Sequence, residues 1–278
     1  MNQIPVGSSS PTISIETGVT NSRKQTTDDN SNEVETQKVK ETGVRALFST
    51  LRDSLDEHYN TREIVIRHSK DITFQSKKLI YIGHRIINSS LDAILKEAAE
   101  KHKEIFQLFK DICVHLSGVN YFRYLRNMSN GFQEYTEAMA FLRYLEHGDL
   151  IKKDEIEANL LDESGNKFLQ ITDLDYVLGI ADLTGELMRY AINSVGKGDH
   201  TRPLEICQFL RNLKAQFSLL NAKPNSPIGK KMEDMKSNLQ KVELVCYALT
   251  IHGSEYPKEF YEFIVSEHSR SSESIYGH

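Results

Sequence analysis

The amino-acid sequence predicts an all-α protein built from about six or seven helices. Apolar residues recur every three or four positions over long stretches, and a strict two-residue alternation persists nowhere. Glycine and proline are few, 15 and 6 in 278 residues, and they cluster between the periodic stretches. These features favour helices over strands, and a chain of this length can bury a substantial core.

The ends of the chain differ from its middle in composition. Residues 1–41 are rich in Ser, Thr, Asn and charged residues and hold almost no large apolar side chains. Such a segment cannot bury enough surface to offset the entropy lost on ordering. We therefore expect a disordered polar tail over residues 1–41, a helical domain over residues 42–267 and a frayed C-terminal tail over residues 268–278.

The first helix is expected over residues 43–86, and the composition near Asn60 leaves an interruption open. One apolar stripe, at steps of three, four and seven, indicates the face that this helix buries. Its members are Val65, Ile72, Leu79, Ile82 and Ile86.

The later helices are marked by residues typical of helix ends. Ser90 and Thr172 are expected to cap N-termini, and Gly148 is expected to end a helix. Thr172 with Asp175 resembles a capping box in which Asp replaces Glu. These helices are expected over about residues 91–117, 120–146, 154–160, 173–194, 201–220, 230–251 and 257–265.

Charge and cysteine content restrict the class of protein. The formal net charge is -5, whereas a protein that binds nucleic acid over a broad surface is usually basic. Any nucleic-acid site must therefore be local or depend on a partner. Three widely spaced cysteines indicate reduced core thiols, and no secretory signal or membrane span is recognisable. We expect an intracellular protein of the cytoplasm and nucleus.

Two segments combine acidic residues with a lack of basic ones. No Lys or Arg occurs between Arg126 and Arg143, where Glu134 and Glu137 lie three residues apart on one helix face. A second such segment, residues 168–188, carries Asp182 and Glu186 at a spacing of four. Each pair alone is most often a solvated helix face.

Together the two pairs could meet across a helical bundle. Four carboxylates within several Å cannot all stay ionised without a cation, because like charges raise each other's pKa. The chain then either holds a divalent metal or keeps some of these groups protonated. Oxygen ligands favour Mg²⁺, Mn²⁺ or Ca²⁺, and the absence of a Glu-x-x-His motif near these acids speaks against a di-iron site.

Three longer motifs resemble the translin family, in its translin-associated protein X branch. They are LGIADLTGELMRYAINSVG over residues 178–196, NGFQEYTEA over residues 130–138 and KVELVCYALTIHGS over residues 241–254. The resemblance extends over about residues 44–265. It implies a bundle of long helices packed side by side, and assembly with translin into a closed hetero-oligomeric shell.

The resemblance also implies an activity, namely Mg²⁺-dependent cleavage of single-stranded RNA, including passenger strands in RNA interference. Mn²⁺ is the expected substitute for Mg²⁺. Glu134, Glu137 and Asp182 match the catalytic, metal-binding acids of the family, and Glu186 matches a fourth acid near the metal.

Basic and aromatic residues alternate on one face of the first helix, which suits single-stranded RNA through phosphate contacts and base stacking. The basic residues predicted to bind RNA are Arg67, Lys70, Lys77, Arg85 and, on a later helix, Arg189. An ordinary solvated face or an oligomer contact is the alternative. For the whole chain, the rival hypothesis is a non-catalytic scaffold that stabilises translin and adapts it to nucleic-acid or protein partners.

Overall fold

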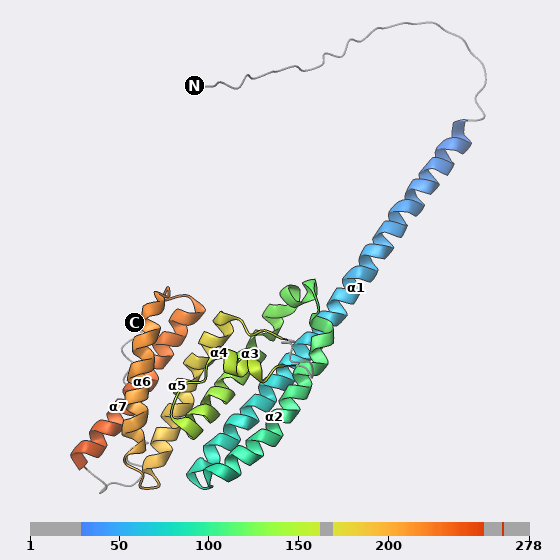
Figure 1. Ribbon diagram of the computed structural model, residues 1–278. Helices are drawn as coiled ribbons and strands as arrows, with labels where there is room; N and C mark the ends of the chain where they lie inside the picture. The colour runs from blue at the N-terminus through green and yellow to red at the C-terminus, as the bar shows by residue number, and fades with distance from the viewer. Residues whose placement is uncertain (1–28, 162–168, 253–262, 264–278) are drawn as a thin grey trace, which may run out of the picture. The chain divides into compact units, whose positions relative to one another are not determined.

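The computed structural model describes residues 29–161, 169–252 and 263, with side chains from residue 43 onward. Within these ranges the chain is helical and contains no β-strand (Figure 1), which confirms the all-α prediction. The chain divides into two compact units, residues 1–56 and residues 57–278.

The first helix, α1, runs from Asp29 to His84 without an interruption at Asn60. It begins earlier than expected, inside the polar segment assigned to a tail, where no Gly or Pro lies between Asp29 and Thr42 to stop it. Residues 1–28 and 268–278 lie outside the described residues, so the tails stay predictions. In the first unit, α1 carries an exposed apolar stripe of Val44, Leu47, Phe48, Leu51 and Leu55.

The other helices agree with the expected ones to within a few residues. They are α2 (Leu91–Cys113), α3 (Val119–His147), α4 (Lys153–Ala158), α5 (Asp173–Val195), α6 (Arg202–Phe217) and α7 (Pro227–His252), with 3₁₀ turns at Arg85–Ile87, Val114–Leu116 and Ser218–Leu220. The hydroxyl of Ser90 accepts the backbone N–H of Ala93 at 3.4 Å, and Gly148 ends α3 at a φ of 71°. The short helix expected over residues 257–265 lies outside the described residues except for residue 263.

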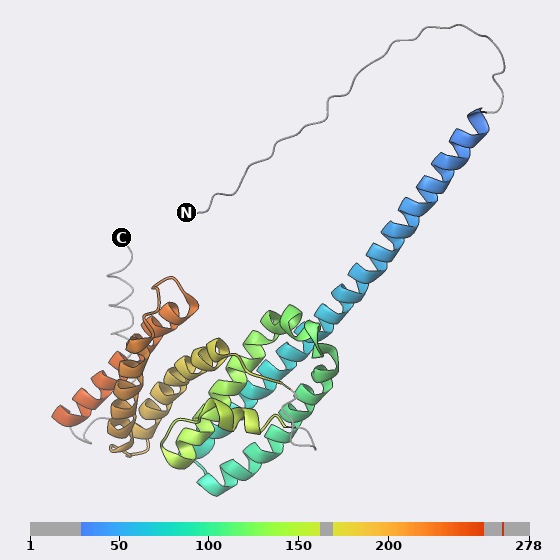
Figure 2. The ribbon, with the colours of Figure 1, turned by 45° about the horizontal axis from the view of Figure 1, so that its top comes forward.

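In the second unit, α5 packs against α3 on one side and against α6 and α7 on the other (Figures 1 and 2). The largest buried side chains are aromatic and come from α2 and α3, namely Phe109, Phe132, Tyr135 and Phe141. The stripe predicted on α1 is buried as expected from Val65 to Ile82, and Ile86 is packed against the same core. Because α5 packs against three helices, its orientation is fixed, and with it the direction of its polar face.

The remaining sequence expectations concern cysteines and membranes. Cys207 and Cys246 are buried and Cys113 is half-buried, and none of the three forms a disulfide within the described residues. No helix in the described ranges is long and apolar enough to cross a membrane.

Candidate functional site

The first acid pair lies in the middle of α3. Glu137 is 8% exposed, and Glu134, one turn earlier, is partly buried. Tyr135 and Phe132 hold this turn of α3 in the core. The spacing of three residues therefore directs both carboxylates toward the same neighbouring elements, as predicted from the helical period.

The second pair lies on α5, whose close approach to α3 depends on a glycine. A Cβ atom added to Gly179 would lie 2.6 Å from the backbone oxygen of Gln133 and 2.7 Å from Cβ of Thr136. No residue with a side chain fits that space without a shift of backbone. Gly179 precedes Asp182 by about one helical turn, so the contact brings the acids of α5 toward those of α3.

The four acids form one electrostatic cluster. Burial is the largest cause that raises the pKa of Glu137, to about 9, and Glu134, Asp182 and Glu186 raise it further. The pKa of Glu134 is also raised, first by burial, with Lys77 opposing the shift and the two acids of α5 adding to it. In the metal-free chain, a pKa raised to about 9 favours the protonated form of Glu137 at pH 7.

Three of the acids have cationic or imidazole partners. Lys77 of α1 lies 3.8 Å from Glu134, and Lys231 of α7 forms an ion pair with Asp182. Glu186 receives two partners, since Nε2 of His84 lies 2.5 Å and Nη1 of Arg189 lies 2.9 Å from its Oε2 atom. These three acids are thus paired with residues that lie outside the two acidic segments.

Glu137 is the exception. Within the described part of the chain it forms no ion pair, although it is the most buried acid of the four. No three His, Cys, Asp or Glu side chains among the described residues are close enough together to hold a metal ion. Asp182 and Glu186 are engaged by Lys231 and His84 instead.

A cavity of about 460 Å³ opens beside these acids. It lies between α1, α3 and α5, and its polar lining comes from Lys77, His84, Glu134, Glu186 and Arg189. Its volume falls within the range of about 300–1,000 Å³ that is usual for ligand sites. A phosphate in it would meet both carboxylates and cations.

The residues predicted to bind RNA do not all reach this cavity. Lys77 and Arg189 line it, and Lys70 lines a neighbouring cavity that also includes Lys77. Arg67 is exposed and lines neither cavity. Arg85 lines neither, and its guanidinium group donates to both carboxylate oxygens of Glu97, at 2.6 and 2.7 Å.

Two partners of the acids were missed by sequence reasoning. His84 follows Lys77 by seven residues, two turns on the same face of α1, so its position could have been inferred. Lys231 is separated from Asp182 by 49 residues, and no local pattern links the two. Arg126, which lines the cavity that also contains Lys70, was likewise missed.

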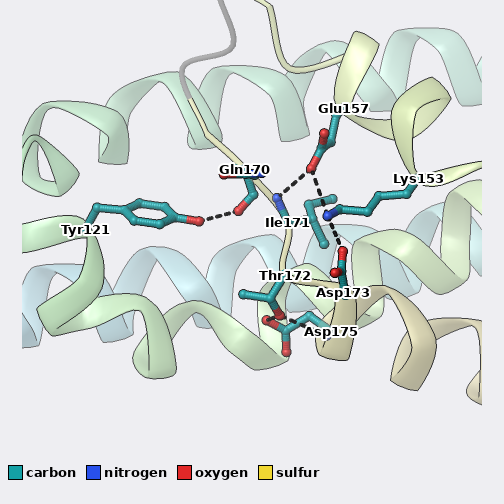
Figure 3. Close-up of polar contacts among 8 residues, drawn as sticks. All are labelled: Tyr121, Lys153, Glu157, Gln170, Ile171, Thr172, Asp173 and Asp175. Atoms are coloured by element: carbon teal, nitrogen blue, oxygen red, sulfur yellow. Dashed lines mark hydrogen bonds and ion pairs between the residues drawn. The ribbon is translucent and has the colours of Figure 1, made fainter. Parts of the chain in front are cut away.

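The start of α5 is fixed by a separate polar network around Asp175 and the loop segment before it (Figure 3). Thr172 caps α5 by accepting the backbone N–H of Asp175 at 2.9 Å, and its hydroxyl donates to the Asp175 carboxylate at 2.7 Å. The predicted cap is thus present. Asp175 also accepts hydrogen bonds from Ser129 and from Gln133, the latter at 2.8 Å, which ties α5 to α3 beside Glu134.

The same network holds the segment that leads into Thr172. Glu157 of α4 accepts the backbone N–H of Ile171 at 3.1 Å, and Tyr121 of α3 donates to the backbone oxygen of Gln170 at 2.5 Å (Figure 3). Lys153 bridges Glu157 and Asp173. These contacts set where α5 begins, and hence how far along α3 its acids lie.

Residues 60–253 match the Translin family. The chain is 37% identical over 235 residues to translin-associated protein X of Rattus norvegicus, covering 77% of this chain and 81% of that protein. It is 31% identical over 218 residues to translin of Mus musculus, covering 76% and 94%. Among solved structures, AfC3PO in complex with duplex RNA is similar in fold, with a TM-score of 0.58, 18% identity and coverage of 75% and 99%.

Proposed function

Because this chain belongs to the translin family, we propose that it is the acid-bearing subunit of a Mg²⁺-dependent endoribonuclease that cleaves single-stranded RNA together with translin. The observation that carries the proposal is that Glu134, Asp182 and Glu186 all act electrostatically on the buried Glu137, while Glu134 and Glu186 line one cavity. Glu137 in particular is a buried acid that forms no ion pair among the described residues, and Lys231 offsets only part of the rise in its pKa. A buried acidic site whose negative charge is not fully neutralised by its neighbours can bind a ligand that supplies positive charge.

The donor set fits magnesium in its chemistry. Carboxylate oxygens are the ligands that Mg²⁺ prefers. Glu134, Glu137 and Asp182 would hold it, with Glu186 near, once Asp182 leaves its ion pair with Lys231 and the carboxylates come closer together than they lie in this structure. When bound, the ion lowers the pKa of a water and neutralises charge on a phosphodiester. Mn²⁺ is proposed as a substitute on the same grounds.

The chain's own side chains have separate tasks in this proposal. Glu137 gives up its proton when a cation binds, because metal ligation favours the charged carboxylate. Arg189 and Lys77 contact the phosphate from opposite elements of the cavity, α5 and α1. His84 positions Glu186 through its Nε2 atom, and its ring packs on Phe141 with 4.6 Å between ring centroids.

Relatives support the partner and the substrate class. The rat protein is named for its association with translin, and AfC3PO is described with duplex RNA. The proposed partner is accordingly translin, and the proposed substrate is a single strand that can enter the cavity. The passenger-strand role and the location in cytoplasm and nucleus stay predictions of the family resemblance.

The decisive test is RNA cleavage by the chain co-purified with translin, comparing the wild type with Glu137→Gln. In Mg²⁺ we expect the variant to lose more than about 100-fold in rate, and EDTA to abolish wild-type activity. Glu146→Gln is the matched control, since Glu146 is an exposed glutamate near the end of α3. If the Glu137→Gln complex assembles normally and cleaves RNA like the wild type, the assignment of the catalytic site to this chain is wrong.

A non-catalytic scaffold is the second candidate, and one observation favours it. Lys77, Lys231 and His84 already engage three of the four acids. On that view the cluster is a structural network that shapes the surface offered to translin. Full assembly with RNA cleavage that is independent of all four acids would support it.

A further inference from the structure

A second cavity adjoins the acidic one. Its volume is about 450 Å³, and it lies between α1 and α3. Lys77 lines both cavities, so they are neighbours along α1. The charged, amide and aromatic residues that line the second cavity are Lys70, Phe74, Lys77, Arg126, Asn127 and Asn130.

No carboxylate of the described residues lines this second cavity, whereas Glu134 and Glu186 line the first. Lys70 and Arg126 are exposed, and within the described part of the chain neither forms an ion pair. Other arginines of this unit are engaged, as Arg85 is with Glu97 and Arg143 with Asp149. Two cations without carboxylate partners therefore face one cavity, which makes it suited to an anion.

The cavity also offers a flat apolar surface. Phe74 lines this cavity and is 56% exposed. The ammonium group of Lys78 lies 4.3 Å from the centre of its ring. Aromatic rings flanked by cations bind single-stranded nucleic acid, because bases stack on the ring while phosphates meet the cations.

We propose that this cavity is a nucleotide subsite for the single-stranded RNA, an inference that rests on the proposed function. Phosphates contact Lys70 and Arg126, and one base stacks on Phe74. Asn127 and Asn130 provide neutral donors and acceptors beside that base. Lys70 and Lys77 are two turns apart, about 10 Å along α1, so the subsite binds nucleotides that adjoin the one at the acids.

An acidic peptide of a partner protein is the competing occupant. RNA is favoured because the two cavities are neighbours. A peptide bound at Lys70 and Arg126 would extend its own carboxylates toward Glu134 and Glu186, which would repel them. An RNA strand would come near Glu134 and Glu186 only at the position where a bound cation is expected to neutralise these acids.

The test compares the double variant Lys70→Gln/Arg126→Gln with the wild type, each co-purified with translin. Binding of a labelled single-stranded uridine oligonucleotide is measured in EDTA over a range of salt concentrations. We expect affinity to fall by about tenfold. We also expect the slope of log affinity against log salt to fall by about 1.4, since each contact to a single strand contributes about 0.7.

The matched control is Lys103→Gln/Arg211→Gln, which removes the same charge from exposed cations of α2 and α6. Unchanged affinity and slope in the cavity variant, or equal losses in both variants, would overturn the subsite. Loss of translin from the Lys70→Gln/Arg126→Gln preparation, with unchanged RNA affinity per remaining complex, would overturn it in favour of a protein contact.

A chain-resolved readout tests the stacking surface. An RNA with photoreactive thiouridine should crosslink to this chain, and Phe74→Leu should lower the yield several-fold. Phe122→Leu, an exposed aromatic of α3 outside the cavity, should leave the yield unchanged. Equal yields for Phe74→Leu and wild type would overturn the assignment of Phe74.

The two proposals fail differently. If the wild-type complex binds RNA but never cleaves it, the endonuclease proposal fails and the binding data still decide the subsite. If cleavage is robust and the cavity variant has an unchanged KM, the subsite fails and the endonuclease proposal stands. A raised KM with an unchanged kcat supports both.

Discussion

Helix α5 takes part in two groups of buried acids that are satisfied in different ways. At its start, Asp175 is 3% exposed and accepts hydrogen bonds from Ser129, Gln133 and Thr172. Farther along, Asp182 and Glu186 face Glu137, which is 8% exposed, forms no ion pair within the described residues and has a pKa raised to about 9. The first group has the donors that a structural carboxylate needs. The second has more acid than its neighbours neutralise, which indicates a role in binding a ligand.

The largest expected effect concerns pH. The pKa of Glu137 rises from 4.5 to about 9 on folding, so the metal-free folded chain holds a proton that the unfolded chain releases between these values. Raising the pH through this window therefore favours unfolding, by at most about 6 kcal/mol at about 1.4 kcal/mol per pKa unit. Glu137→Gln should flatten the pH dependence of stability in EDTA, as measured by urea unfolding.

Glu146→Gln serves as the control for that experiment, because Glu146 is exposed on the same helix. Parallel stability curves for Glu137→Gln and wild type between pH 4.5 and 9 would mean that Glu137 is not the buried neutral acid.

The next largest effect concerns the satisfied group. Asp175→Ala leaves the donors of Ser129, Gln133 and Thr172 without their acceptor, and should cost about 2–4 kcal/mol of unfolding free energy. Asp173→Ala is the control, since the Asp173 side chain is 90% exposed and, among the described residues, pairs with Lys153 alone. Equal denaturation midpoints for the two variants would contradict the contrast between the groups.

A smaller effect is expected where the two groups are joined by close packing. Gly179→Ala forces a Cβ atom to within 2.6 Å of the Gln133 backbone oxygen, and should cost about 1–3 kcal/mol while displacing Asp182 from Glu134. Gly185→Ala, on the same helix, meets only the amide nitrogen of Asn238 at 3.6 Å. It should stabilise the chain by up to about 1 kcal/mol. Thermal unfolding of both variants checks the opposite signs.

The smallest effect is the loss of the helix cap. Thr172→Ala should destabilise the chain by about 1 kcal/mol, because the backbone N–H of Asp175 loses its acceptor. Thr172→Ser keeps the hydroxyl and should retain most of the stability in the same denaturation series. A serine variant as unstable as the alanine variant would place the effect in the methyl group instead of the cap.

Much of the fold was predictable because its signals are local. The helical period of Val65, Ile72 and Leu79 and the cap at Ser90 need only neighbouring residues. The start of α1 was not predicted, because low apolar content was given more weight than the absence of helix breakers between Asp29 and Thr42.

The candidate site was predictable in part for the same reason. The sequence by itself determined that Glu134 and Glu137 share one face of a helix, and that Asp182 and Glu186 share another, because a period of 3.6 residues is a property of the local backbone.

Only the tertiary structure decided which cations meet those acids. Lys231 is 49 residues from Asp182, and His84 is 102 residues from Glu186. Their pairing depends on how α1, α3, α5 and α7 pack, down to the absence of a side chain at Gly179. Charge partners across a bundle are set by interhelical distance and burial, and neither quantity is encoded in the spacing of residues along one helix.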